Sequence, residues 1–271
     1  MRRVKVKKNP QSGVIGRRFE KLVDLMYTLR SEGGCPWDRA QSLHDMKQYL
    51  LEETYELLET LDQENQEGMR EELGDLLFQV VFLSQMMQER GAFTLREVLD
   101  QFLEKMISRH PHVFGRVKAG SPAGALDTWE GMKEKQYASA KGKRRALLQG
   151  VPHNFPALLQ AHLISSKVAR VGFDWKSEKD VWKKFHEERV EFSEAVSQRE
   201  KEEEMGDMLF TMVNIARKNG INPEDALRSA NAKFRKRFNR LEEKVRASGR
   251  NLKELTLKEM DEIWENVKKE G

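Results

Sequence analysis

The chain has 271 residues, which is enough for two domains with separate hydrophobic cores or for one large domain. Charged residues make up 34% of the sequence and apolar residues 38%, with only 7 prolines, a balance that favours amphipathic helices over a β-sheet protein. This composition predicts an all-α protein. The formal net charge of +4 is spread over many acids and bases, and we expect no stable nucleic-acid partner.

A large part of the excess positive charge lies at the N-terminus, in a tail that we place at residues 1–18. Its basic side chains belong to Arg2, Arg3, Lys5, Lys7 and Lys8. A short basic tail could touch nucleic acid or acidic lipid, but a solvated extension is the commoner structure for such a segment. We assign the tail no function.

The cysteine content and the apolar segments bear on the cellular compartment. A single cysteine, Cys35, excludes an intrachain disulfide and fits a reducing compartment. The longest apolar run, residues 76–87, is interrupted by glutamine and serine and is too short and too polar to span a bilayer. The N-terminal region lacks the pattern of a secretory signal. We therefore expect a cytoplasmic protein that does not enter a membrane.

Apolar residues recur with helical spacing over residues 50–61 and again over residues 73–83, which predicts two consecutive helices. The segment between them, residues 63–68, is polar and ends in glycine. Such a short connection predicts that the two helices are antiparallel neighbours, because a few residues cannot carry the chain far from the first helix.

The helical pattern fails between residues 138 and 156, where a cluster of basic residues is followed by Gly150, Pro152 and Pro156. Glycine and proline interrupt regular structure, so we place a linker at residues 138–156. The sequence then predicts an N-terminal domain at residues 19–137 and a C-terminal domain at residues 157–271.

The two predicted domains repeat one another, with the order and spacing of their motifs retained. Each copy has a glycine–tryptophan turn, a Glu-Glu-x-x-Glu motif and a Glu-x-Gly-Asp motif followed by an apolar helix. The first copy contains Gly34-Cys-Pro-Trp37-Asp, Glu52-Glu53-x-x-Glu56 and Glu72-Leu-Gly74-Asp75. The second contains Gly172-Phe-Asp-Trp175, Glu187-Glu188-x-x-Glu191 and Glu204-Met-Gly206-Asp207. Farther on, Lys105, Arg109 and Trp129 match Lys233, Arg237 and Trp264.

The acidic motifs predict a cluster of carboxylates. Residues three apart on a helix share a face, so Glu53 pairs with Glu56 and Glu72 with Asp75, and a hairpin brings the two pairs together. Four close carboxylates repel one another, and a cation would relieve this repulsion. Ligand sets made only of oxygen suit magnesium, manganese or calcium, whereas zinc and di-iron sites recruit histidine or cysteine. We expect Mg²⁺, with Mn²⁺ as a substitute.

An ordinary solvated helix face is the alternative explanation of any single Glu-Glu-x-x-Glu motif. The recurrence of the motif, followed each time by Glu-x-Gly-Asp and an apolar helix, favours a functional site. Gly74 and Gly206 add weight because a glycine inside a helix costs about 1 kcal/mol relative to alanine. Such a glycine permits close approach of another helix or of a ligand, and the sequence leaves both explanations open.

Basic and aromatic residues follow each acidic set. Lys105 lies four residues before Arg109, and Lys233 four before Arg237, so each pair shares a helix face and could meet phosphate oxygens or form a solvated stripe. Trp129 and Trp264 could stack on a base or fill a core. No phosphate-binding loop, dinucleotide-binding turn or nucleophile elbow occurs. The remaining candidate nucleophile is water activated by a metal ion, which suits attack on phosphorus.

The paired acidic motifs, together with Arg109-His-Pro-His-Val-Phe-Gly115, resemble those of the bacterial MazG proteins, which are nucleoside triphosphate pyrophosphohydrolases. The resemblance extends from about residue 19 to residue 268. It implies two tandem helical-bundle domains, usually in a homodimer, that use Mg²⁺ to convert NTPs and dNTPs to a nucleoside monophosphate and pyrophosphate. Non-standard nucleotides are candidate substrates as well.

The resemblance also implies roles for individual residues. The metal ligands fall on Glu188, Glu191, Glu204 and Asp207 in the second copy, and on Glu53, Glu56, Glu72 and Asp75 in the first. The catalytic positions are Glu187, Glu188, Glu52 and Glu53. The substrate contacts fall on Lys233, Arg237, Trp264, Lys105, Arg109 and Trp129.

Two other functions stay open on the sequence. One is a related all-α enzyme with a narrower substrate, such as a dimeric dUTPase, although such chains usually carry a single copy. The other is a non-catalytic helical scaffold, which would show no metal-dependent turnover. Family members can rely on one domain, and we expect hydrolysis mainly in the second copy, where the chain after Arg237 continues as a helix. The chain after Arg109 stops at Pro111.

Overall fold

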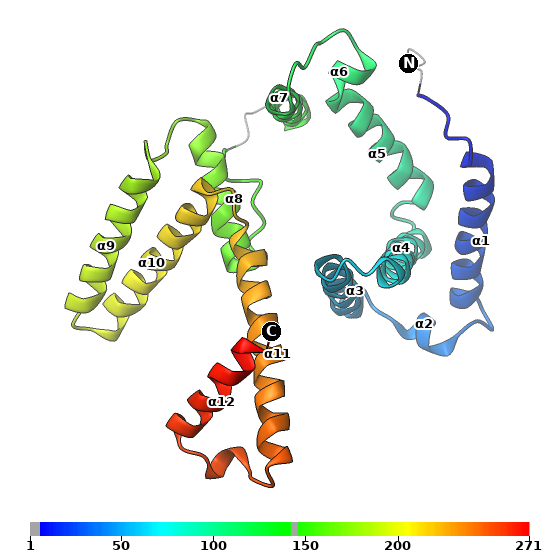
Figure 1. Ribbon diagram of the computed structural model, residues 1–271. Coiled ribbons are helices and arrows are strands. Elements are labelled where there is room, and N and C mark those ends of the chain that lie inside the picture. The colour runs from blue at the N-terminus through cyan, green and yellow to red at the C-terminus, as the bar shows by residue number, and fades with distance from the viewer. Residues whose placement is uncertain (1–5, 142–145, 271) are drawn as a thin grey trace. The chain divides into compact units, whose positions relative to one another are not determined.

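A computed structural model describes residues 6–141 and 146–270 of the chain. Within these ranges the secondary structure consists of twelve α-helices and one short 3₁₀ helix, with no β-strand, which confirms the predicted all-α class (Figure 1). Nowhere in the described ranges is a helix long and apolar enough to cross a membrane.

The chain divides into two compact units, Met1–Arg144 and Arg145–Gly271, called unit 1 and unit 2 below. Unit 1 contains α1 (Ser12–Arg30), α2 (Pro36–Ala40), α3 (Asp45–Asp62), α4 (Gln66–Glu89), α5 (Leu95–Arg109), α6 (Pro111–Phe114) and α7 (Pro122–Lys141). Unit 2 contains α8 (Ala157–Arg170), α9 (Glu178–Glu194), α10 (Gln198–Lys218), α11 (Pro223–Ala247), η1 (Leu252–Glu254) and α12 (Leu257–Lys269).

The helix bounds differ in part from the tail and linker expected from the sequence. Helix α1 begins inside the predicted tail, and α7 extends four residues into the predicted linker, while α8 begins at the first residue of the predicted C-terminal domain. Arg2, Arg3 and Lys5 of the tail, and residues 142–145 of the linker, lie outside the described residues.

The predicted helical hairpin is present in unit 1 as α3 and α4, which pack side by side across a three-residue connection. Asn65 starts α4 by accepting a hydrogen bond from the backbone N–H of Gly68 at 3.2 Å, which satisfies one of the free amides of the first turn. Met26 of α1, Met46 of α3 and Phe82 of α4 are buried together in the core beside this hairpin.

Helices α9 and α10 form the matching hairpin of unit 2. Each begins with a reciprocal capping box, Ser177 with Asp180 and Ser197 with Glu200, in which side chains satisfy the free amides at the helix start. These caps fix where the two helices begin.

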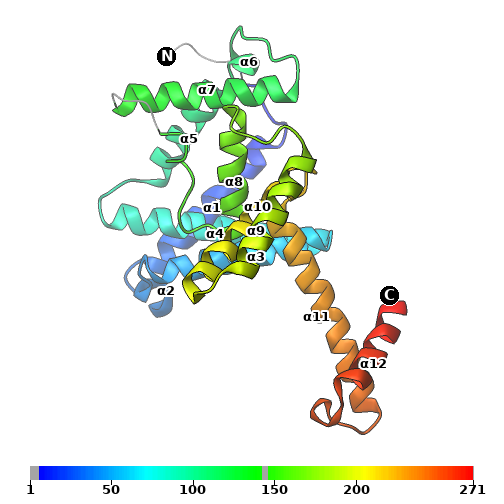
Figure 2. The ribbon, with the colours of Figure 1, turned by 90° about the vertical axis from the view of Figure 1, so that its left-hand side faces the viewer.

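Helix α11 extends away from the rest of unit 2. It contacts α8 and α10, and α12 packs against it through a small core of Leu241, Val245 and Val267. Figures 1 and 2 both show the α9–α10 hairpin and the C-terminal half of α11 diverging from their common end near α8. The pair formed by α11 and α12 thus projects away from the hairpin.

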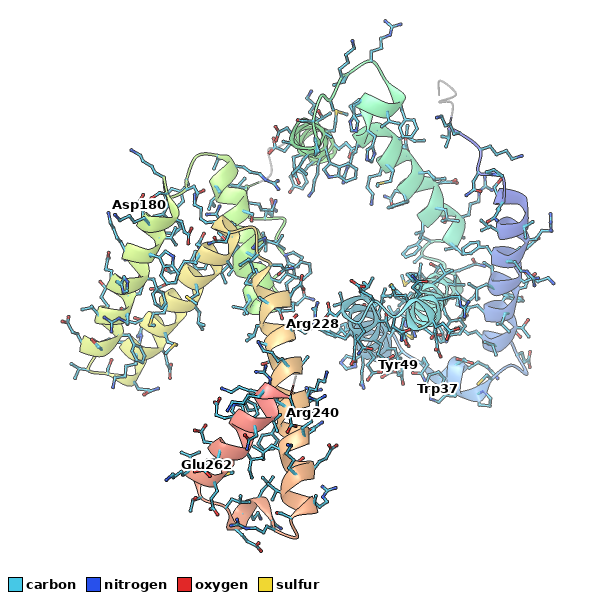
Figure 3. The ribbon with its side chains drawn as sticks, viewed as in Figure 1. Trp37, Tyr49, Asp180, Arg228, Arg240 and Glu262 are labelled. Carbon is cyan, nitrogen blue, oxygen red and sulfur yellow. The ribbon has the colours of Figure 1, made fainter. Side chains whose placement is uncertain are left out.

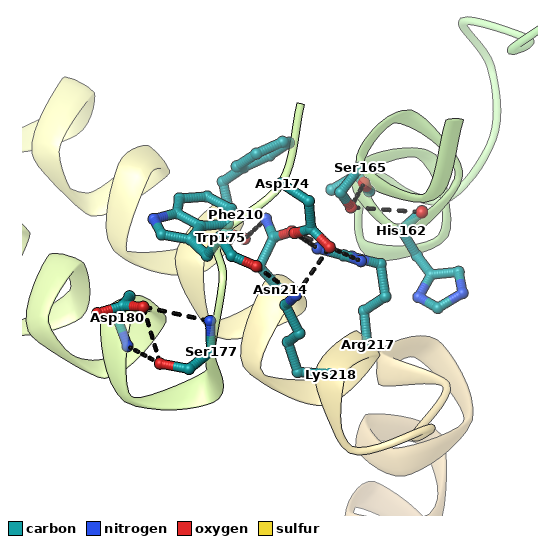
Figure 4. Close-up of polar contacts among 11 residues, drawn as sticks. His162, Ser165, Asp174, Trp175, Ser177, Asp180, Phe210, Asn214, Arg217 and Lys218 are labelled. Carbon is teal, nitrogen blue, oxygen red and sulfur yellow. Dashed lines mark hydrogen bonds and ion pairs between the residues drawn. The ribbon is translucent and has the colours of Figure 1, made fainter. Parts of the chain in front are cut away.

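An ion-pair network ties the segment before α9 to the end of α10 (Figure 4). The carboxylate of Asp174 accepts hydrogen bonds from Arg217 at 2.5 Å and from Lys218 at 2.7 Å. Lys218 also donates to the backbone oxygen of Trp175 at 2.7 Å. The hydrogen bonds from Arg217, with those from Lys218, lower the pKa of Asp174 from 3.8 to about 2.

We expect Asp174→Ala to destabilise unit 2 by about 1.5–3 kcal/mol, because the two half-buried cations lose their charged hydrogen-bond acceptor. The carboxylate stabilises the fold above its ordinary pKa of 3.8, and this stabilisation is lost as the pH falls towards 2. Urea denaturation should therefore show a difference between variant and wild type at pH 7 that shrinks below pH 4. Asp261→Ala, at an exposed site on α12, is the control. Equal losses for both variants would contradict the assignment.

Candidate active site

Three carboxylates meet where α9 and α10 pack together in unit 2. Glu188, Glu191 and Glu204 each offer an oxygen atom, and these atoms lie within 4.8 Å of one another. Glu188 is buried, with 5% of its surface exposed, whereas Glu191 is exposed. A three-residue spacing on α9 and a facing position on α10 produce this geometry. We call these three residues cluster 2.

The first copy repeats the arrangement between α3 and α4. Glu53, Glu56 and Glu72 offer oxygen atoms within 4.8 Å of one another, and we call them cluster 1. Glu53 and Glu72 are half-buried and Glu56 is exposed. Two hairpins with different connections therefore place the same motif positions together.

The electrostatics of the clusters show the repulsion expected from the sequence. Desolvation, followed by the charge of neighbouring acids, raises the pKa of Glu72 in cluster 1 and of Glu204 in cluster 2 above the ordinary 4.5. Desolvation also raises the pKa of Glu53 and Glu191, the second with a contribution from adjacent Glu188. Such shifts mean that each cluster holds its negative charge at a free-energy cost.

The other predicted acids lie around the clusters rather than in them. Asp75 and Asp207 fall outside the groups of three, although their charges still raise the pKa of Glu72 and Glu204, respectively. Glu52 is exposed and accepts a hydrogen bond from Gln48 at 2.7 Å.

Cluster 2 contains a cation that the motif analysis missed. The ammonium group of Lys184 lies 2.8 Å from Glu188 and 2.5 Å from Glu187, and these hydrogen bonds raise the pKa of Lys184 well above its usual value. The position is taken in the first copy by Tyr49, whose ring packs against Trp37 at 5.6 Å (Figure 3). The sequence signal for Lys184 was its position four residues before Glu188, since residues at this spacing share a helix face.

Cluster 1 instead has a neutral neighbour, which was also missed. Gln79 is buried, with 8% of its surface exposed, and its amide donates to Glu53 at 3.3 Å. The Gln79 side-chain oxygen has no hydrogen-bond partner in the described part of the chain, although it is buried. The corresponding residue of unit 2 is Thr211. Among the described residues, cluster 2 has an ion pair with a cation, Lys184, and cluster 1 has none.

The basic and aromatic residues that come after the acidic motifs of unit 1 contact one another. The guanidinium group of Arg109 lies 5.3 Å from the ring centre of Trp129, and its Nε donates to Gln136 at 2.9 Å. The ring of His110 lies against Trp129 at 4.9 Å, and Lys105 lies over a neighbouring phenylalanine. These contacts occupy both the cation and the aromatic face that would otherwise meet a nucleotide.

The equivalent residues of unit 2 are less constrained. Lys233 is exposed and Arg237 half-buried, and neither makes a hydrogen bond or ion pair within the part of the chain that the structure describes. Trp264 packs against Phe234, with ring centres 5.1 Å apart. The geometry within one chain does not bring these residues onto cluster 2, because α11 diverges from the α9–α10 hairpin (Figure 1).

Neither mid-helix glycine is explained by packing within its own unit. A Cβ atom added to Gly74 or Gly206 would meet no atom within 4 Å. Both positions face open space beside the acidic clusters. Of the two explanations left by the sequence, close packing of another helix of the same chain has no support at these positions.

Comparisons with known proteins agree with the geometry. A family model described as the MazG nucleotide pyrophosphohydrolase domain matches residues 41–114 and 176–241, the segments that hold the two clusters. The chain is 46% identical, over 254 residues, to the nucleoside triphosphate pyrophosphohydrolase/pyrophosphatase MazG of Thermotoga maritima, covering 93% of this chain and 96% of that protein. It is 40% identical over 259 residues to the nucleoside triphosphate pyrophosphohydrolase of Escherichia coli K12, covering 93% and 98%. The chain therefore belongs to the MazG nucleotide pyrophosphohydrolase family.

Proposed function

We propose that this protein hydrolyses nucleoside triphosphates to a nucleoside monophosphate and pyrophosphate, with Mg²⁺, or Mn²⁺ in its place, held by the acidic clusters. The observation that carries the proposal is the recurrence of three converging carboxylates at the same motif positions of both units. Family membership supports it, since the relatives from Thermotoga maritima and Escherichia coli are named for this activity.

The residues present fit a hard divalent cation. Each cluster offers only carboxylate oxygens, the ligands that Mg²⁺ prefers, and their raised pKa values show a charge that a cation would relieve. The side-chain oxygen of Gln79, whose amide nitrogen donates to Glu53, is buried without a hydrogen-bond partner among the described residues and is a neutral oxygen donor next to cluster 1. When bound, Mg²⁺ would lower the pKa of a coordinated water and neutralise phosphate charge.

In unit 2, Glu188, Glu191 and Glu204 would hold the cation, with Asp207 completing the acidic set. Lys184 holds Glu187 and Glu188 in place and adds a positive charge where the phosphates would approach. Glu187, which is exposed beside the cluster, is the candidate acceptor of the proton released by the attacking water.

The helix surfaces support a homodimer. Leu73, Leu77 and Val80 of α4 are exposed, and so are Met205, Leu209 and Met212 at the matching positions of α10. An apolar face left open twice at repeat-matched positions is typical of a surface that another protein covers. A second copy of the chain is the partner we propose, because most soluble oligomers are symmetric homo-oligomers.

Product analysis tests the proposed function directly. We expect incubation with each NTP and dNTP to yield the nucleoside monophosphate and pyrophosphate only when Mg²⁺ or Mn²⁺ is present, since no other nucleophile system is visible. Chromatography of the nucleotides and a pyrophosphate assay provide the measurement. Nucleoside diphosphate and orthophosphate as products would refute the proposal. Turnover of one substrate alone would support the narrower dUTPase-like enzyme, and no turnover at all would support a scaffold.

A further inference from the structure

Gln79 of α4 has a buried side-chain oxygen that accepts no hydrogen bond from any residue that the structure describes. Only 8% of the residue is exposed, and its amide nitrogen donates to the carboxylate of Glu53 at 3.3 Å, so the carboxamide lies against cluster 1. A buried polar atom without a partner destabilises a fold. An ion or a water molecule is the ordinary partner of such an atom when the protein itself supplies none.

The position of Gln79 on α4 connects it to the acidic motif. It lies seven residues after Glu72 and four after Asp75, which is about two turns and one turn of an α-helix, so the three side chains share one stripe of α4. Glu53 and Glu56 approach this stripe from α3. Gln79 therefore adds a fourth oxygen-bearing side chain at a place where three carboxylates already converge.

A carboxamide oxygen beside carboxylates suits a hard divalent cation. Carboxylate and carbonyl oxygens, together with water, are the ligands of Mg²⁺, Ca²⁺ and Mn²⁺. Desolvation and the charges of neighbouring acids already raise the pKa of Glu53 and Glu72, and a neutral ligand adds a coordinating atom without adding to this repulsion. Gln79 is buried and Glu56 is exposed, so the cluster has an inner oxygen shielded from solvent and an outer side open to an entering ion.

Cluster 2 lacks this ligand and has a positive charge of its own. Thr211 occupies the position of Gln79 in the repeat, and its hydroxyl group cannot extend as far as a carboxamide. The ammonium group of Lys184 lies 2.8 Å from Glu188 and offsets one negative charge. Among the described residues, no lysine or arginine forms an ion pair with the acids of cluster 1. A cation that approaches cluster 2 competes with this ammonium group, whereas one that approaches cluster 1 meets uncompensated carboxylates.

We propose that cluster 1 binds a divalent cation in the absence of nucleotide, with the side-chain oxygen of Gln79 as a neutral ligand, and that cluster 2 binds one only together with the phosphates of a nucleotide. The inference rests on the proposed function, in which both clusters are cation sites, and deepens it by giving the two copies different tasks. In unit 1 the cation links α3 to α4. In unit 2 the phosphates supply the negative charge that Lys184 offsets and the oxygen ligand that Thr211 does not provide.

Titration of the full chain with Mn²⁺ alone tests the proposal. The protein is treated with EDTA, the chelator is removed, and unbound Mn²⁺ is measured by electron paramagnetic resonance. We expect one Mn²⁺ per chain without nucleotide, and a second one when an α,β-methylene nucleoside triphosphate, which resists cleavage between these phosphates, is added. Either no bound ion or two bound ions per wild-type chain without nucleotide would overturn the proposal.

Variants of the two clusters assign the bound ion to one copy. Glu53→Gln should abolish binding of Mn²⁺ without nucleotide, and Glu188→Gln, its matched control at the equivalent position, should leave this binding unchanged. Loss of binding in Glu188→Gln would overturn the proposal. Lys184→Met removes the ammonium group at nearly constant length and should raise the count to two ions per chain without nucleotide. An unchanged count would overturn the part of the proposal that concerns cluster 2.

Two substitutions separate a ligand at position 79 from a hydrogen-bond donor. Gln79→Met keeps the length of the side chain and removes both polar atoms, so it should weaken Mn²⁺ binding by about tenfold or more. Gln79→Glu keeps an oxygen ligand and adds a charge, but its ionised carboxylate cannot donate to Glu53. Calorimetry at pH 7.5 should show Mn²⁺ binding tightened by about tenfold in this variant, since the added charge attracts the cation.

A residue that only holds Glu53 in place predicts the opposite result for Gln79→Glu. Unchanged or weaker binding in that variant would overturn the ligand role, as would wild-type affinity in Gln79→Met. Circular dichroism establishes that each variant is folded.

These measurements do not depend on turnover. Hydrolysis of nucleotides by a wild-type protein that binds no Mn²⁺ without nucleotide would overturn this inference and leave the proposed function standing. Absence of hydrolysis in the presence of Mg²⁺ would refute the proposed function itself, whatever the number of bound ions.

Discussion

Replacing Glu188 by glutamine should lower kcat/KM for a nucleoside triphosphate by at least about a hundredfold, near 2.7 kcal/mol of transition-state stabilisation, whereas Glu53→Gln should change it only slightly. The two substitutions each remove one formal charge and almost preserve size. They occupy equivalent positions of the repeat, one buried beside Lys184 and the other half-buried beside Gln79. A difference between them therefore reports which cluster performs hydrolysis.

The expected difference in activity between the two clusters has a physical basis in the basic and aromatic residues that come after each of them in the sequence. In unit 1, Arg109 is held by Gln136 and lies over the ring of Trp129, so this cation and this aromatic face already have partners. In unit 2, Lys233 and Arg237 have no hydrogen bond or ion pair among the described residues and can meet phosphate oxygens. Cluster 2 also has the ammonium group of Lys184 beside it, whereas the matching position of unit 1 is Tyr49.

Steady-state kinetics of both variants provide the measurement, with circular dichroism and sedimentation to establish that fold and oligomer are unchanged. The reverse pattern, a large loss for Glu53→Gln and a small one for Glu188→Gln, would move the main site to unit 1. Comparable partial losses would show that both units work. Gln136→Ala is an informative companion, since freeing Arg109 should not change a rate that belongs to unit 2.

Magnesium should raise the melting temperature of the protein, because a ligand at about 100 times its Kd stabilises the folded state by roughly 2.7 kcal/mol. The stabilisation should be greater at pH 7.5 than at pH 5. Glu53, Glu72, Glu191 and Glu204 have a pKa above the ordinary 4.5 in the folded protein, so the folded state binds protons more tightly than the unfolded state. Without metal, their contribution to stability falls as the pH rises from 4.5 through their raised pKa values.

A bound cation reverses this dependence, since it requires the charged carboxylates and relieves their repulsion. Differential scanning calorimetry with EDTA and with saturating Mg²⁺, at both pH values, measures the effect. Sodium chloride at equal ionic strength controls for general screening. The double variant Glu53→Gln/Glu188→Gln should lose most of the shift. An unchanged melting curve at both pH values, with no calorimetric heat of binding, would count decisively against metal sites in the folded protein.

The sequence by itself determined the helical class, the hairpin of residues 50–83 and the internal repeat, because these depend on periodicity, caps and motif spacing. It also determined the acidic positions, since carboxylates three apart on neighbouring helices converge once the hairpin forms. Cluster 1 and cluster 2 contain six of the eight predicted metal ligands. Asp75 and Asp207 fall outside these two groups of three.

Tertiary structure decided which charges accompany the acids. Gln79 falls beside Glu53 through the packing of α4 on α3, and a chain rich in glutamine offers no local mark that singles it out. Lys184 instead lies one helical turn from Glu188 on α9, so its spacing was visible in the sequence, but only the structure shows the ion pair. It also decided that Arg109 is held by Gln136 of α7, a contact between residues 27 positions apart. The exposure of residues 229–236 likewise could not be predicted from helical periodicity, because burial is a property of neighbours in space.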